Sequence, residues 1–343
     1  MFKLLPYLLT ACLLTACLLH PKAGHGQGIH FSQYFNSPQL LSPANTALTP
    51  DADYRIGANY RNQWTTIPAP FRTMSAYGDL KALGSADGTN WLGIGAAVFS
   101  DRAGTGDLSL LKVQIQSAYH LQVGDYNMLS VGLGIAFAQR SVNFGKLTFD
   151  AQWDGFRFNP AYSQQENYDF QKTGYPDIAA GLNYAFFPND DIYFKVGLAI
   201  DHINRPKESF YNFENRLGMR PMANIDFLVR LNNNWIASVS GYYTQQKEAS
   251  EMVFGGQVSS NLSPQQQKPS VLILGVYHRL GDAIIPLVGF EWNKLTASVS
   301  VDVPVSGIAR ATRGNSALEF SLFFKGLYGG RGGGPGVYSC PRF

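Results

Sequence analysis

Apolar and polar residues alternate one by one in many stretches of the chain between residues 54 and 325. In IYFKVGLAID (192–201), every second residue from Ile192 to Ile200 is large and apolar, whereas the residues between them include Lys195 and Asp201. VGLGIAFAQ (131–139) and ALEFSLFFK (317–325) have the same period of two. This pattern is typical of β-strands with one apolar face and one mixed face. We interpret the apolar face as facing lipid and the other as lining a polar interior.

About fourteen such segments follow one another, with turn residues between them. Repeated alternation over about ten residues is the pattern of a transmembrane β-barrel, so we predict an all-β fold, an antiparallel barrel of about fourteen strands. The expected strands lie near 54–64, 71–81, 90–101, 107–121, 126–140, 175–187, 191–201, 219–231, 234–245, 250–261, 269–280, 283–292, 294–304 and 315–325.

The lengths of the connections test this count. An even number of strands returns both chain ends to one side of the membrane, and the short connections should then be on that side. The segments 122–125, 188–190 and 232–234 fit the rule, and the long segments 141–174, 202–218 and 305–314 all fall on the opposite side. The exceptions are a tight turn near 281 and a longer connection at 262–268. This sorting favours a closed barrel over a secreted β-sandwich.

The N-terminal segment MFKLLPYLLTACLLTACLLHPKAGHGQG has a basic residue at Lys3 and then an apolar run from Leu4 to Leu19. It predicts a signal peptide of residues 1–26, because the run is too short for a membrane-spanning helix. The alternative is a lipoprotein signal, since LTAC occurs twice and ends at Cys12 and at Cys17. No other apolar run approaches the roughly 20 residues of a membrane helix.

The composition agrees with a membrane barrel. Charged residues make up 15% of the chain, below the roughly 25% of soluble domains, and aromatic residues make up 13%. Without residues 1–26 the chain has 25 basic and 24 acidic residues, so no basic footprint for nucleic acid is present. We find no GxSxG, HExxH or phosphate-binding loop, and therefore expect no enzyme activity and no cofactor. Cys340 would be the one cysteine left, which excludes a CxxC metal or redox motif.

Two segments lie outside the expected barrel. We call residues 27–53 the leader, and residues 326–343 the tail, which includes GGRGGGPGVYSCPRF from Gly329. The barrel itself is expected at 54–325. The leader has proline and asparagine at turn-like positions, and the tail is too rich in glycine to pack before Val337.

These segments also carry a resemblance to a known family. FSQYFNSPQLLSPANTAL (31–48) resembles the N-terminal signature of the PorP/SprF family of type IX secretion system membrane proteins. The likeness continues through YRIGANYRNQW (54–64), PFRTMSAYGDL (70–80), PDIAAGLNY (176–184), GLAIDHINRPKESFYN (197–212) and GDAIIPLVGFEWNKLTASVSVDV (281–303), and ends with ALEFSLFFK and CPRF. Ser42 and Leu48 replace a more usual Asn and Gly, and the glycine run is unusually long.

The resemblance implies a Bacteroidota outer-membrane protein, and the even number of strands predicts that both chain ends are periplasmic. Members of the family are needed for secretion or surface attachment of large adhesins, including those of gliding motility. By resemblance, the expected partners are the C-terminal domain of a cargo adhesin, the type IX machinery and membrane lipid. The alternatives are a channel for small or hydrophobic solutes and a soluble, lipid-anchored β protein.

Three groups of residues are candidates for partner binding, and each has a structural alternative. The leader motifs could instead plug the lumen, the aromatic residues of 141–174 could form a membrane-interface girdle, and the end of the tail could clamp the barrel's own rim. Aromatic and arginine side chains are enriched in protein interfaces, and this is the argument for the long loop as a docking surface; the membrane-interface girdle has equal support. The candidates are Ser32, Gln33, Tyr34, Pro43, Ala44, Trp153, Phe156, Arg157, Cys340, Pro341, Arg342 and Phe343.

Overall fold

The computed structural model describes residues 31–49, 52–64, 70–85, 88–159, 161–162, 171–210, 213–263, 270–306 and 317–328. Within these ranges the chain forms fourteen antiparallel strands that close into one barrel. The strands are β1 (Tyr54–Gln63), β2 (Phe71–Gly84), β3 (Asn90–Ala103), β4 (Leu108–Val123), β5 (Asn127–Ser141), β6 (Lys172–Asn189), β7 (Ile192–Asp201), β8 (Arg220–Asn232), β9 (Trp235–Gln246), β10 (Ala249–Asn261), β11 (Ser270–Arg279), β12 (Ala283–Trp292), β13 (Leu295–Pro304) and β14 (Ala317–Gly326).

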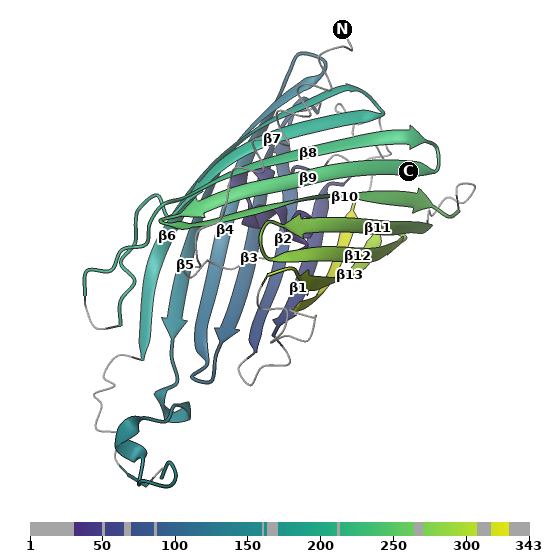
Figure 1. Cartoon of the computed structure of the whole chain (residues 1–343). Helices are drawn as coiled ribbons and strands as arrows, with labels where there is room; N and C mark the ends of the chain where they lie inside the picture. Colours follow the sequence, from purple (N-terminus) through teal and green to yellow (C-terminus); the bar gives the residue numbers. More distant parts are fainter. Residues whose placement is uncertain are drawn as a thin grey trace.

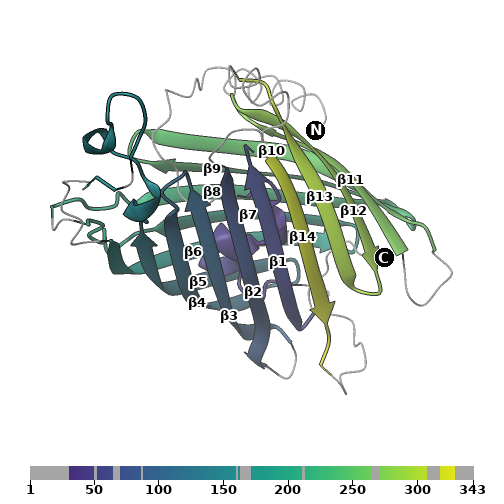
Figure 2. The same cartoon turned by 90° about the horizontal axis from the view of Figure 1, so that it is seen from below.

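Each strand pairs with its sequence neighbours, and β1 also pairs with β14. The register between the first and last strands runs from Tyr54 opposite Gly326 to Gln63 opposite Ala317. Closure leaves no strand edge, so every backbone group at membrane depth can find a partner. The ribbon views show the tilted strands wrapping round a central lumen (Figures 1 and 2). The predicted fold class is confirmed.

Some strands are longer than predicted. β6 begins at Lys172 instead of residue 175, because its pairing with β5 continues to Ser141 opposite Lys172. β4 continues to Val123, which pairs with Asn127 across a tight turn. Alternation weakens at strand ends while the backbone ladder continues, so periodicity underestimates these lengths.

The two ends of the barrel differ. At the end that we call the turn end, β1 begins, β14 finishes, and most connections are tight turns. At the opposite end, the loop end, lie the long connections β5–β6, β7–β8 and β13–β14. Part of the β5–β6 connection extends well away from the strands (Figure 1). It contains two short 3-10 helices, η4 (Phe144–Lys146) and η5 (Asp150–Gln152).

The faces of the strands agree with the sequence pattern. In β7 the side chains of Tyr193, Lys195 and Asp201 are buried, whereas Val196 and Leu198 are exposed on the outside. In β5 the outer residues include Leu133, which is 63% exposed. Burial here means contact with the contents of the lumen, and the exposed apolar surface is what a lipid bilayer would cover.

The leader fills much of that lumen. Its described residues form three 3-10 helices, η1 (Tyr34–Asn36), η2 (Pro38–Leu40) and η3 (Pro43–Asn45). They lie in the space that the strands enclose, as the purple segment in Figure 2 shows. No helix within the described ranges is long and apolar enough to cross a membrane.

Candidate functional site

The first leader motif is held by a buried carboxylate of the wall. Glu319 on β14 accepts the backbone N–H of Ser32 at 2.7 Å and that of Gln33 at 2.8 Å. All three residues are fully buried. Bonds from N–H groups to a charged acceptor are about twice as strong as neutral ones, so Glu319 fixes the leader backbone at this point.

The Ser32 hydroxyl joins the leader to a buried ion network. Its Oγ donates to Asp302 on β13 at 2.7 Å and accepts from Arg61 on β1 at 2.6 Å and from Arg279 on β11 at 2.8 Å. One donor and two acceptor positions are all that a serine hydroxyl has. Arg61 in turn forms ion pairs with Asp302 at 2.7 Å and with Glu319 at 3.3 Å. Removing one member of such a network leaves a buried charge without its partner, which costs more than the pair itself contributes.

The Gln33 side chain is also fully engaged with the wall. Its Nε2 donates to the Ser300 hydroxyl and to the backbone carbonyl of Glu319, both at 3.0 Å. Its Oε1 accepts from Ser298 at 2.6 Å and from Asn36 of the leader at 2.9 Å. The predicted motif therefore lies in the lumen, and its polar atoms contact the protein's own wall.

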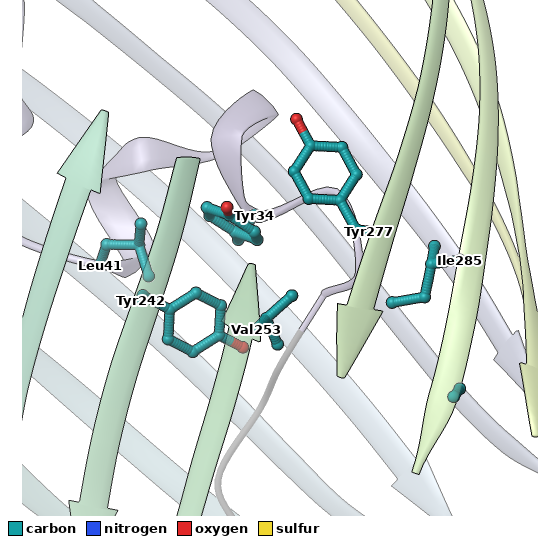
Figure 3. Close-up of a cluster of buried hydrophobic side chains, with 7 residues drawn as sticks. Tyr34, Leu41, Tyr242, Val253, Tyr277 and Ile285 are labelled. Atoms are coloured by element: carbon teal, nitrogen blue, oxygen red, sulfur yellow. The ribbon is translucent and has the colours of Figure 1, made fainter. Parts of the chain in front are cut away.

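Tyr34 lies in an aromatic cluster with tyrosines of β9 and β11 (Figure 3). Its ring packs edge-on against Tyr242 of β9 at 4.8 Å between centroids and against Tyr277 of β11 at 6.0 Å. Its hydroxyl shares a hydrogen bond of 2.7 Å with Ser240. Edge-to-face aromatic pairs add roughly 0.5–1.5 kcal/mol beyond area burial. Tyr34 thus ties the leader to β9 and β11, whereas Ser32 ties it to β1, β11, β13 and β14.

Pro43 and Ala44 form the second predicted motif, in η3, and lie against glycine residues of the wall. A methyl group at Gly132 of β5 would overlap the backbone of both residues, and one at Gly181 of β6 would overlap Ser42. The Ser42 hydroxyl caps η3 by accepting the Ala44 N–H at 3.2 Å. Glycine at these inward positions lets the leader approach the sheet closely.

The residues after η3 are held by side chains that the sequence did not single out. His120 of β4 lies 2.8 Å from the carbonyl oxygen of Thr46 and stacks on Trp91 of β3. Ala47 has a positive φ of 55°, which is unfavourable for a non-glycine residue. Its N–H donates to Asp79 at 2.9 Å, and its carbonyl accepts from the Trp91 indole at 3.1 Å. These bonds stabilise the turn that brings the leader back to β1.

The long β5–β6 loop places its candidate residues in solvent. Phe156 is 93% exposed, and the Arg157 side chain is 82% exposed. Trp153 is half exposed and packs edge-on against Phe158 at 5.0 Å. The Asp154 carboxylate accepts the backbone N–H groups of Arg157 and Phe156, each at 2.8 Å, and these bonds lower the pKa of Asp154. The loop thus presents an aromatic ring and a guanidinium on an ordered tip.

A cavity of about 220 Å³ lies at the loop end of the lumen, and we call it the lumen chamber. Gln39 and Leu40 of the leader border it, as do Lys112 of β4 and Arg140 of β5. His202, from the β7–β8 connection, is also part of its lining. The chamber is therefore bounded by leader, wall and loop together.

The predicted residues do not form one site. Ser32, Gln33, Tyr34, Pro43 and Ala44 lie in the lumen, whereas the three loop residues are exposed beyond the loop end. The last four candidates, Cys340, Pro341, Arg342 and Phe343, lie outside the described residues.

The wall residues Arg61, Glu319 and His120 are additional positions that sequence reasoning missed. Their signal was a charged or polar side chain on the inward face of an alternating strand. That pattern indicates an interior position without naming the partner.

Closed strands with an apolar outer face and a lumen filled by an N-terminal segment define an outer-membrane-type β-barrel with an internal plug. Comparison with solved structures agrees with the fold. A mutant of the TodX monoaromatic hydrocarbon channel matches with 8% identity and a TM-score of 0.50, covering 84% of this chain and 93% of that one. A FadL homologue of Pseudomonas aeruginosa matches with 9% identity and a TM-score of 0.49, covering 83% and 92%. At 8% identity, the likeness to the TodX mutant concerns the fold alone.

The family model of the type IX secretion system membrane protein PorP/SprF matches residues 23–324 of the chain. The chain belongs to this family, as its resemblance implied. A comparison with curated proteins finds no match.

Proposed function

We propose that the protein is a non-enzymatic outer-membrane component of the type IX secretion system that binds and anchors a cargo adhesin. In this proposal the adhesin is of the gliding type and is recognised through its C-terminal domain. Family membership supports the link to type IX secretion. The single structural observation in favour of a docking role is that the leader occupies the lumen and is bonded to the wall, which leaves the two ends of the barrel as the surfaces for partners.

The leader's contacts extend round the barrel, which argues against a freely open pore. Besides the wall residues that hold Ser32 and Tyr34, Asn183 of β6 and Lys195 of β7 each donate to Asn45 at 3.0 Å. A plug bonded on several sides would have to break many buried hydrogen bonds to leave, and each buried group left unpaired costs about 1–3 kcal/mol. A fixed scaffold with docking surfaces at its two ends fits this interior better than a solute pathway.

The proposal assigns the two ends different partners. The loop end faces the cell exterior and presents Phe156 and Arg157 to the cargo domain. The turn end faces the periplasm with both chain ends, and the tail with Cys340–Phe343 contacts the type IX machinery. The signal peptide of residues 1–26 is removed after export, and the apolar outer face of the barrel contacts membrane lipid.

The test is a pull-down from native membranes with the full-length chain and with a variant that lacks residues 329–343. We expect the full-length chain to recover both an adhesin and type IX machinery, and the truncated variant to lose the machinery but keep the adhesin. A protein that recovers neither class of partner would overturn the proposal. An unchanged partner list after truncation would overturn the role of the tail.

The alternative is a channel or transporter for small or hydrophobic solutes. The fold is similar to that of a mutant of the TodX monoaromatic hydrocarbon channel, and the lumen chamber is a space within the barrel lined by both polar and apolar side chains. Single-channel conductance of the purified protein in planar bilayers separates the two functions. A plugged scaffold should be silent, whereas steady conductance would favour the channel.

A further inference from the structure

The lumen chamber has a feature that the docking role does not require. Among the described residues, three pairs of a Lys or Arg with a carboxylate border it, and in each the cation is more exposed than its acid. The exposed side-chain fractions are 17% against 2% for Lys112–Asp177, 31% against 12% for Arg140–Glu208, and 16% against 9% for Arg220–Asp201. The three carboxylates also line the chamber, but they are less exposed than the cations, and this biases the accessible charge of the chamber towards positive.

Arg140 has hydrogen-bonding capacity to spare. Its Nε lies 2.5 Å from Glu208 Oε1, and among the described residues no partner bonds its two terminal nitrogens. A guanidinium carries five N–H donors in a planar fork, and the terminal pair matches the two oxygens of a carboxylate. Lys112 uses one of its three ammonium donors on Asp177, at 2.8 Å. Both cations can therefore bind a second carboxylate while they keep the bond to the carboxylate of the wall.

The position of the chamber sets the direction of approach. Lys112 and Arg140 lie in the halves of β4 and β5 nearest the loop end, and the leader residues Gln39 and Leu40 lie on the side towards the turn end. A ligand would therefore enter past the β7–β8 connection, which contributes His202, Glu208 and Leu217 to the lining. The volume of about 220 Å³ is more than ten times the roughly 10–15 Å³ that one water needs.

We propose that the lumen chamber is a binding site for a carboxylate group of a polypeptide that enters from the loop end. The polypeptide nature of the ligand rests on the proposed function. Arg140 would bind the carboxylate through both terminal nitrogens, and Lys112 would contribute a second positive charge. The carboxylate is either the free C-terminus of the partner chain or an acidic side chain within it.

Three short peptides distinguish these sources in titrations of the purified full-length barrel followed by NMR or calorimetry. Acetyl-Gly-Gly-Gly has a free C-terminal carboxylate, acetyl-Gly-Asp-Gly-amide has only a side-chain carboxylate, and acetyl-Gly-Asn-Gly-amide has neither. We expect saturable binding of at least one acidic peptide with a Kd of about 1 mM or tighter. The neutral peptide should bind at least about tenfold more weakly. Equal binding of all three, or no saturable binding, would overturn the proposal.

Two variants and a control locate the site. Arg140→Gln and Lys112→Met should each weaken binding of the acidic peptide by about tenfold or more. Lys146→Gln removes an exposed cation of the long loop and should leave binding unchanged. Unchanged binding in both chamber variants would overturn the assignment. If neither variant folds, as judged by heat-dependent mobility in gels, the comparison of acidic with neutral peptide on the unaltered protein decides.

The titration uses the barrel alone, so its outcome is independent of the pull-down. Recovery of adhesin and machinery together with a flat titration would refute the chamber site and leave the proposed function intact. Saturable binding without partner recovery would refute the proposed function and leave the chamber as a carboxylate site.

Discussion

Glu319 is the wall residue whose replacement most directly tests how the leader is held. Its carboxylate accepts the backbone N–H groups of Ser32 and Gln33 and is 3.3 Å from Arg61. Glu319→Gln keeps the shape of the side chain but removes its charge. It also places an NH₂ group, which cannot accept a hydrogen bond, towards one of the donors.

The size of the effect follows from these contacts. A hydrogen bond to a charged group contributes about 1.5–3 kcal/mol, and breaking a buried ion pair costs about 3–5 kcal/mol. Since glutamine retains one acceptor oxygen, we take the lower end and expect the leader to be about 3 kcal/mol less firmly held. That corresponds to roughly a 100-fold larger population with the Ser32–Gln33 segment detached.

Hydrogen exchange measures this population at the amides concerned. We expect the amides of Ser32 and Gln33 to exchange about 100-fold faster in Glu319→Gln, while amides in β4 and β5 keep their protection. The matched control is Glu214→Gln, which removes a carboxylate from the exposed β7–β8 connection. A folded Glu319→Gln barrel whose Ser32 and Gln33 amides exchange within a few-fold of the unaltered protein would refute the reasoning.

Further predictions concern the leader and the long loop. Gly132→Leu should displace the leader at Ala44 and lower the stability of the plugged state by about 1–3 kcal/mol. The displaced leader should then allow measurable conductance in a bilayer, whereas the control Gly78→Leu, on the outer face, should stay silent. A Gly132→Leu barrel without conductance would contradict the close approach of the leader to the wall. Asp154 has a lowered pKa, so its stabilisation of the loop tip is complete above the ordinary aspartate value of about 4 and is lost as the pH falls through the lower folded value. The NMR chemical shift of the Phe156 amide between pH 7 and 2 should follow this titration. An identical pH profile in Asp154→Asn would show that the shift does not come from the Asp154 carboxylate. Phe156→Ser should reduce adhesin recovery in the pull-down; unchanged recovery with weaker association with lipid vesicles would instead support a membrane-interface role.

The barrel wall could be predicted because its pattern depends on local surroundings. Each residue of β7 faces either lipid or the interior, so Lys195 and Asp201 alternate with apolar residues whatever the rest of the chain does. The position of the leader could not be predicted in the same way. Its 3-10 turns have no periodicity, and the glycines that accommodate it, such as Gly132, also suit any small interior position.

The ion network was beyond sequence reasoning for a different reason. Arg61, Asp302 and Glu319 could each be placed on an inward face by alternation. Which of them meet depends on the closing register between β1 and β14 and on the tilt of the strands, and Arg61 and Glu319 are 258 positions apart. Predicting the lumen chamber would require still more tertiary information, because the leader, the wall and the β7–β8 connection all contribute residues to its lining.

The bonds of Ser32 and Gln33 have a consequence for how the molecule is assembled. These two residues contact the first strand and the last two strands at once, through Arg61, Asp302 and Glu319. The sheet closes where β14 pairs directly with β1, and the two leader residues bridge that seam from the side of the lumen. Arg61 already pairs with Asp302 and Glu319 across the seam. A barrel without the leader would keep these ion pairs but lose the hydrogen bonds by which Ser32 and Gln33 tie both margins of the seam together from within.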